Sequence, residues 1–189
     1  MTESEETRVR QFKELMVCNG KPVCSDEVIE QLVEWGFFSA PASTKYHGSY
    51  EGGLYDHSSY VTTALLDLTV GQDLEWERSE SPYIIGMFHD LCKCDQYLDI
   101  YGDYEFNTKS SLKGHGEKSI ALLSTLMQLT MEEVMCIRYH MGAFTDKSEW
   151  SDYTRAIHTY PNVLWSHTAD MMATHTVDCE GTQYAYQIH

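Results

Sequence analysis

The sequence predicts an all-α fold in a single domain that spans residues 1–189. Apolar residues recur at helical spacing along most of the chain, and residues that favour helix starts precede several of these apolar stripes. Only four prolines interrupt the 189 residues, and no change of composition marks a linker. A hydrophobic fraction of 42% in a chain of this length is sufficient for a buried core.

Capping residues predict where individual helices begin and end. The N-terminal helices are expected within residues 5–36, packed on the rest of the domain. In the clearest of them, Val28 and Leu32 share one face, Ser25 is a suitable N-cap and Gly36 a suitable stop. These signals predict a helix that ends near Gly36.

The next two helices are predicted from similar signals. An apolar stripe follows Asp56, which is a candidate N-cap, and Gly71 is expected to end that helix. Ser81-Pro82 begins the following helix, because proline is favoured in the first helical turn.

Later in the chain, Thr130–Glu133 has the pattern of a capping box and predicts a helix start. A last helix is expected over residues 162–176, after Pro161. One segment differs: residues 97–106 alternate and turn at Gly102-Asp103, which predicts a small β-hairpin inside the helical domain.

The net charge limits the partners. Thirteen basic and 29 acidic residues give a formal charge of −16, and no cluster of lysine or arginine is present. Such a charge repels long nucleic acids and anionic membranes. A bound divalent metal would still attract a small phosphorylated substrate.

The N-terminal residues and the cysteines indicate the expected compartment. Residues 1–6 are polar and acidic, unlike a secretory signal, so we expect a cytoplasmic protein. The six cysteines fit no spaced zinc pattern, and reduced thiols are the default there. A redox pair formed by Cys92 and Cys94 is the alternative.

Several ionisable residues lie on or beside apolar helix faces. Burial of one such group without a partner costs several kcal/mol, roughly 2–7 for a neutral polar group. Any one of them alone is expected to be a hydrogen-bonded core residue, but several can be tolerated together if they converge on a cation. These residues are His57, His89, Asp90, His115, His140 and Asp170.

The residue types indicate an open catalytic metal site. Imidazole and carboxylate without thiolate favour Mn, Fe, Co, Ni or Zn, with Mg also compatible. Lys93 follows His89-Asp90 by one helical turn and is predicted to face the same side, towards the negative charge of a substrate. The alternative is a solvated lysine paired with Asp95 or another nearby acid.

These residues resemble the H…HD…D signature of the HD superfamily of metal-dependent phosphohydrolases. Residues 52–58 (GGLYDHS) resemble the family's G-G-L-x-x-H-S element, and residues 89–93 (HDLCK) its H-D-x-x-K element. Ala169-Asp170 resembles the A-D of its late helix. The motif core extends from about residue 46 to 175, and the resemblance implies an HD-domain helical bundle over the whole domain.

The resemblance implies a ligand set. His57, His89, Asp90 and Asp170 would hold one metal. His115 and His140 occur in the order of two further histidines that hold a second metal in the binuclear branch, where the HD aspartate bridges. The alternative is that His115 and His140 donate hydrogen bonds to the substrate phosphate.

The resemblance also implies hydrolysis of a phosphate ester by metal-activated water. The catalytic residues would be Asp90, Lys93, His115 and His140, and the substrate a nucleotide or related small phosphorylated metabolite.

Further side chains are candidates for contact with the substrate. Tyr97 and Tyr101 of the predicted hairpin could stack on a base or only cover the core, and His47 is expected to line the pocket. The remaining histidines are assigned to the surface or the core: His158, His167, His175 and His189.

Other functions are compatible with an HD domain. Some members with the same ligand pattern bind two irons and oxidise an organic substrate with oxygen, and others bind nucleotides as regulatory modules without turnover. HD exoribonucleases share the G-G-L element, but the charge of this chain disfavours RNA. Bound iron together with oxygen uptake would identify a di-iron oxygenase. Nucleotide binding without turnover would identify a regulatory module.

Overall fold

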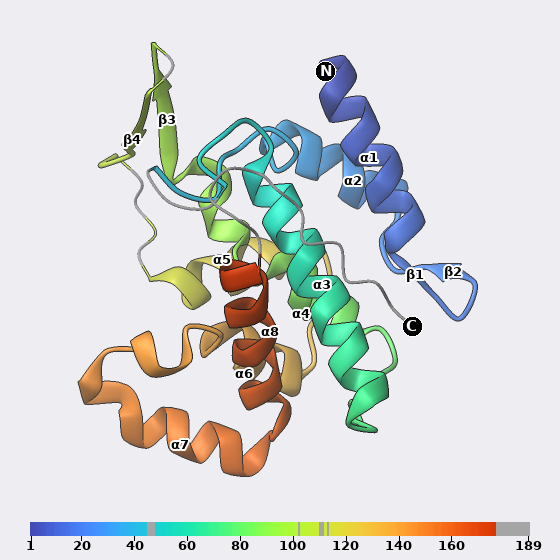
Figure 1. Ribbon diagram of the computed structural model, residues 1–189, viewed down its shortest axis with the longest axis vertical. Helices are drawn as coiled ribbons and strands as arrows, with labels where there is room; N and C mark the ends of the chain where they lie inside the picture. Colours follow the sequence, from blue (N-terminus) through green and yellow to red (C-terminus); the bar gives the residue numbers. More distant parts are fainter. Residues whose placement is uncertain (45–47, 102, 110–111, 113, 177–189) are drawn as a thin grey trace.

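The computed structural model describes residues 1–44, 48–101, 103–109, 112 and 114–176. The described residues form eight α-helices and two small antiparallel sheets (Figure 1). The α-helices are α1 Glu3–Leu15, α2 Asp26–Glu34, α3 Gly53–Gly71, α4 Ser81–Phe88, α5 His115–Leu123, α6 Met131–Arg138, α7 Trp150–Thr159 and α8 Asn162–Thr176. The short elements are η1 Leu91–Asp95, η2 Gly142–Phe144, η3 Lys147–Glu149, β1 Val17–Cys18, β2 Lys21–Pro22, β3 Tyr97–Ile100 and β4 Asp103–Phe106. The predicted all-α fold with a small hairpin is therefore confirmed.

Helix α3 is the central element. It runs through the middle of the molecule, with α1 and α2 on one side and α5 to α8 on the other (Figure 1). Its most extensive packing is against α4 and α8. Phe12 of α1 is fully buried in the same apolar cluster as Leu65 of α3 and Phe88 of α4. The N-terminal segment therefore packs on the rest of the chain.

Several predicted boundaries are confirmed. The Ser25 hydroxyl accepts a hydrogen bond from the Val28 amide at the start of α2. Thr130 and Glu133 form both hydrogen bonds of a capping box at α6. Pro82 lies in the first turn of α4, and α8 covers residues 162–176 as expected.

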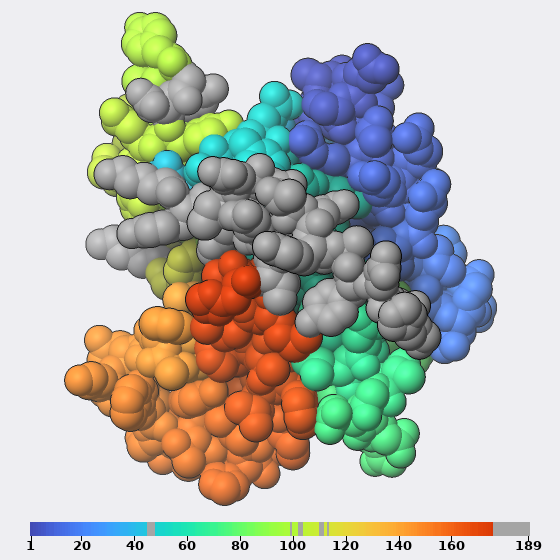
Figure 2. Space-filling model, viewed as in Figure 1, coloured from blue at the N-terminus to red at the C-terminus, as the bar shows by residue number. Residues whose placement is uncertain are grey.

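The hairpin β3–β4 pairs Tyr97 with Phe106 and Ile100 with Asp103. It stands out from the rest of the surface in the space-filling view (Figure 2). None of the helices described, over residues 1–176 without the masked positions, is long and apolar enough to cross a membrane.

The sequence prediction missed the hairpin β1–β2. Asn19 and Gly20 both have positive φ, at 51° and 74°, and connect the paired residues Cys18 and Lys21. An Asn-Gly pair is the favoured two-residue hairpin turn, so the signal was present in the sequence. The segment over residues 5–36 is thus two helices separated by a hairpin.

The predicted N-cap at Asp56 is wrong. Helix α3 begins at Gly53, after Gly52 with φ of 84°. Arg8 of α1 occupies the space that a side chain at residue 52 would need and donates hydrogen bonds to the carbonyl oxygens of Phe38 and Glu51. Asp56 lies inside the helix instead, with its carboxylate 3.9 Å from the Arg8 guanidinium. Arg8 therefore holds the start of α3, the helix that contains His57.

The crossing of α3 and α4 depends on Gly86. A Cβ atom at residue 86 would lie 2.5 Å from the Thr62 Cα atom, inside the α3 backbone. We predict that Gly86→Ala lowers the free energy of unfolding by about 1–3 kcal/mol, because overpacking exceeds the gain of less than about 1 kcal/mol in helix propensity. Denaturant unfolding measures this difference.

Gly71→Ala is the matched control. It ends α3, and a Cβ there meets no heavy atom within 4 Å. Its stability should match the wild type or exceed it by up to about 1 kcal/mol. A Gly86→Ala protein as stable as the Gly71→Ala protein would contradict the role given to this crossing.

Candidate metal centre

Five helices bring six ionisable side chains to one place. His57 comes from α3, and His89 and Asp90 follow the last residue of α4. His115 is the first residue of α5, His140 follows α6 by two residues, and Asp170 lies in α8. These residues form three sets, and within each set the ligand atoms of the three residues lie within 4.8 Å of one another. The sets are His57, His89 and Asp90; His89, His140 and Asp170; and Asp90, His115 and His140.

The first group surrounds the Oδ2 side of Asp90. The Nε2 atoms of His57 and His89 are 3.2 Å apart, and the His57 Nε2 atom is 3.2 Å from the Asp170 Oδ1 atom. Asp90 Oδ2 lies 3.5 Å from His89 Nε2 and 3.8 Å from His57 Nε2. Ligand atoms of a tetrahedral zinc site lie roughly 3.3–3.6 Å apart, given bonds of about 2.0–2.2 Å. These residues are therefore spaced as ligands of one cation.

The second group surrounds the Oδ1 side of the same carboxylate. Asp90 Oδ1 is 3.5 Å from both His115 Nδ1 and His140 Nε2. Within the described residues, Asp90 Oδ1 and His140 Nε2 are buried and have no hydrogen-bond partner. A buried polar atom in that condition costs about 1–3 kcal/mol, and a cation between them would remove this cost. The two oxygens of Asp90 thus face two different groups of histidines.

Backbone carbonyl groups fix the orientation of two imidazoles. His89 Nδ1 lies 2.9 Å from the Gly86 oxygen, and His140 Nδ1 lies 2.8 Å from the Ile137 oxygen. A carbonyl oxygen can only accept, so each Nδ1 atom carries the proton and donates. The Nε2 atom of each ring therefore faces the centre, the orientation that is usual for metal-binding histidines.

The carboxylates of the centre are ionised. Burial raises the pKa of Asp90, but Lys93 and His89 outweigh burial and hold the pKa well below its usual range. The pKa of Asp170 is likewise lowered, because a hydrogen bond to His57 and the charge of His89 outweigh burial.

The pKa values of the histidines move in opposite directions. Burial lowers the pKa of His57 and of His115. For His89, burial lowers the pKa, but the neighbouring Asp90 carboxylate outweighs burial and the pKa is raised. At His89, a metal must therefore compete with a proton for the ring nitrogen.

Lys93 lies inside the site. Its Nζ atom is 2.6 Å from Asp90 Oδ2, and its side chain is 12% exposed. Burial lowers the pKa of Lys93, but Asp90 outweighs burial and raises the pKa, so the ammonium is charged. The alternative of a solvated lysine is wrong, because the side chain is largely buried and the nearby acid with which it pairs is Asp90. Asp95 pairs with Lys118 of α5.

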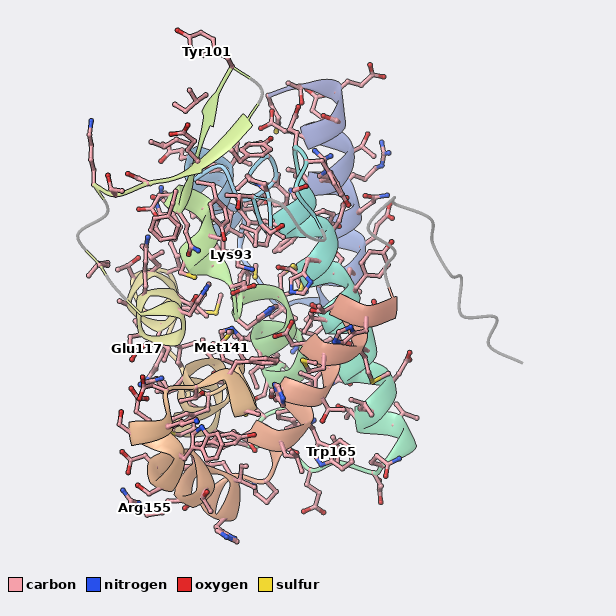
Figure 3. All side chains as sticks on the ribbon, turned by 60° about the vertical axis from the view of Figure 1, so that its left-hand side comes forward. Lys93, Tyr101, Glu117, Met141, Arg155 and Trp165 are labelled. Atoms are coloured by element: carbon pink, nitrogen blue, oxygen red, sulfur yellow. The ribbon has the colours of Figure 1, made fainter. Side chains whose placement is uncertain are left out.

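The centre opens into a cavity of about 730 Å³. Lys93 and Met141, which line this cavity, lie in the middle of the molecule (Figure 3). The cavity is lined by Ala42, Ser43, His57, Asp90, Lys93, Tyr97, His115, Met141, Phe144, His167, Asp170, Met171, Thr174 and His175. Tyr97 thus lines this cavity, and its contact with a substrate stays a prediction.

Tyr101 does not reach the cavity. It lies at the tip of the hairpin with positive φ and is fully exposed, far from Lys93 (Figure 3). The predicted contact of Tyr101 with the substrate is therefore corrected, because the turn directs it into solvent. His47 and His189 lie outside the described residues.

Two histidines assigned to the surface or the core also line the cavity, and His175 is exposed as expected. His167 and His175 lie on α8 with Asp170, and both contribute to the cavity wall. His167 precedes Asp170 by three residues, so helical spacing alone places it on the same face. That spacing is the signal in the sequence for the position of His167. His158 is exposed on α7, as expected.

Cys92 is a neutral thiol in contact with the His115 ring. Its Sγ atom is 3.1 Å from His115 Nδ1, and burial raises the pKa of the thiol to about 12. Cys92 and Cys94 are both free among the described cysteines, so they do not form a disulfide in this structure.

Comparison of the chain with models of known families, with curated proteins and with solved structures finds no match.

Metal affinity is predicted to depend on pH through His89, which lies beside the Asp90 carboxylate. The pKa of His89 is raised, so a metal must displace a proton from it, and metal affinity should increase as the pH rises through that pKa. Titration calorimetry with Zn²⁺ or Mn²⁺ from about pH 6.5, the ordinary pKa of histidine, upwards should show tighter binding at higher pH, because the pKa of His89 is raised above that value. The apparent enthalpy should differ between buffers of different ionisation enthalpy, which reports proton release.

His158→Ala is the control for this titration, because it removes an exposed histidine outside the cavity and should leave the pH dependence unchanged. Metal binding that is equally tight across this pH range, without proton release, would contradict the assignment of His89 as a ligand.

Proposed function

We propose that this protein is a metal-dependent phosphohydrolase of the HD type that acts on a nucleotide or related small phosphorylated metabolite. The observation that supports this most strongly is Asp90, whose two carboxylate oxygens face separate groups of histidines. A bridging carboxylate between two cation positions is a typical arrangement of two-metal phosphoryl-transfer sites.

The residues fit a divalent metal at both positions. His57, His89, Asp90 and Asp170 offer nitrogen and oxygen atoms at ligand spacing, and none of the four is a thiolate. At the second position, the unpartnered Asp90 Oδ1 and His140 Nε2 atoms would bind the ion together with His115. The site therefore suits one or two ions of Mn, Fe, Co, Ni or Zn, or Mg.

A divalent metal held there supplies an activated water and polarises a phosphoryl oxygen. The chain itself supplies positive charge through Lys93, whose ammonium is already positioned by Asp90 and shielded from solvent. Charge that moves to the leaving oxygen can be met by this ammonium, and partial desolvation strengthens the contact. Lys93 is the single lysine or arginine among the described residues that line the cavity.

The cavity supports a small substrate. Its volume of about 730 Å³ lies within the usual range for small-molecule sites, roughly 300–1,000 Å³. Tyr97, Met141 and Phe144 give it apolar walls, against which a base could pack. The net charge of −16 disfavours a long nucleic acid as substrate.

Phosphate release from a panel of nucleotides and sugar phosphates tests the proposal. The protein is loaded in turn with Mn, Co, Ni, Fe, Zn and Mg. We expect metal-dependent release from at least one panel member, and loss of both release and metal binding in Asp90→Ala. Oxygen uptake by the iron-loaded protein without phosphate release would favour the di-iron oxygenase. Nucleotide binding with no turnover in any metal would favour the regulatory module.

Lys93→Ala extends this test to the proposed charge donor. We expect kcat/KM to fall at least about tenfold, or roughly 1.4 kcal/mol, with no loss of bound metal. Lys147→Ala removes an exposed lysine of η3 and should leave turnover unchanged. Equal activity of the Lys93→Ala and Lys147→Ala proteins would contradict a role of Lys93 in the reaction.

A further inference from the structure

His167 has a fixed orientation next to the candidate metal centre. Its Nδ1 atom lies 2.8 Å from the carbonyl oxygen of His140. The carbonyl oxygen can only accept, so Nδ1 carries the proton and donates. His167 is thus held by the backbone in the same way as His89 and His140, although it belongs to none of the three sets of possible metal ligands.

Gly142 leaves the space that the His167 ring occupies. Gly142 has a φ of 53°, and a Cβ atom there would lie 2.4 Å from the Cγ and Cδ2 atoms of the His167 ring. Any residue other than glycine would displace the imidazole. The ring is therefore fixed on one face by Gly142 and at one nitrogen by His140, and it lines the cavity together with Asp170 and Lys93.

This orientation determines what the ring can recognise. With its proton on Nδ1, a neutral imidazole offers a lone pair at Nε2 and accepts a hydrogen bond there. The fully ionised oxygens of a phosphate group only accept, so they cannot pair with this atom. The partner must be a donor on the part of the substrate adjacent to the phosphate. In a nucleotide, the donors nearest to the phosphate are the sugar hydroxyl groups.

The geometry points to His167 as the residue that selects the sugar: its Nε2 atom accepts a hydrogen bond from a ribose hydroxyl of the bound nucleotide. This inference rests on the proposed function, because it places the phosphate at the metal centre. The sugar would then lie between the metal centre and the apolar wall formed by Met141 and Phe144. A site that accepts a substrate hydroxyl strongly rejects an analogue without it, because its own polar atom is left unpaired.

The test uses the preferred nucleotide and its analogues that lack the 2′-hydroxyl, the 3′-hydroxyl or both. We expect the metal-loaded wild type to discriminate against at least one analogue by about tenfold or more in kcat/KM. In His167→Asn this discrimination should fall to less than about threefold, because the asparagine amide can donate to the His140 carbonyl but has no atom at the Nε2 position. Bound metal should be unchanged.

Two further variants control this experiment. His167→Gln places an amide oxygen near the Nε2 position and should restore part of the discrimination. His158→Ala, on the exposed face of α7, should behave as the wild type. A loss of kcat/KM in His167→Asn that is equal for every analogue, or a wild type that treats all analogues alike, would overturn the inference.

Failure of the proposed function gives a different result. If the wild type releases phosphate from no nucleotide, the proposed function is wrong, and the same analogues are then compared by calorimetric binding to the metal-loaded protein. Discrimination in Kd that His167→Asn abolishes would still support recognition of the hydroxyl by His167. Binding that does not depend on either hydroxyl, or no binding at all, would overturn this inference as well.

Discussion

The site depends on a single buried charge, the carboxylate of Asp90. Moving an ionised carboxylate from water into a protein interior costs roughly several kcal/mol unless cations and hydrogen bonds surround it. Here Lys93 and His89 hold the carboxylate ionised, and one oxygen is left without a hydrogen-bond partner among the described residues. Nitrogen atoms of His57, His115 and His140 lie 3.5–3.8 Å from its oxygens, so α3, the start of α5 and the end of α6 meet around one charge. Asp170 of α8 joins this cluster through His57 and His89.

Close backbone contacts make this convergence possible. Gly86 lets α4 approach Thr62 of α3, which brings His89 near His57. Gly116 lets α5 approach the end of α6, since a Cβ there would lie 2.6 Å from the Arg138 carbonyl oxygen. Contacts of this kind fix how closely the helices that carry the imidazoles approach each other, and interior packing resists any change of volume there. The geometry of the site is therefore fixed by backbone packing as much as by the ligands themselves.

Much of the candidate site could be predicted because its residues are exceptions to local patterns. His57 and Asp170 interrupt apolar helix faces, and the caps of α2 and α6 are short-range signals. The errors have other causes. Asp56 did not cap α3 because Arg8, 48 positions away in sequence, fixes an earlier start at Gly53. His167 shares the face of Asp170 by helical spacing, a signal that is present in the sequence, but its contact with Gly142 joins two separate elements and is not visible in any local pattern.

Metal stoichiometry is the most direct test of the central claim that Asp90 joins two cation positions. The protein is saturated with Mn²⁺ or Co²⁺, freed of excess ion and analysed for metal per chain. We expect two ions in the wild type and in His158→Ala, one in His140→Ala and in His115→Ala, and none in Asp90→Ala. One ion in the wild type, with the same content in both single-histidine variants, would contradict the second position and leave His115 and His140 as substrate contacts.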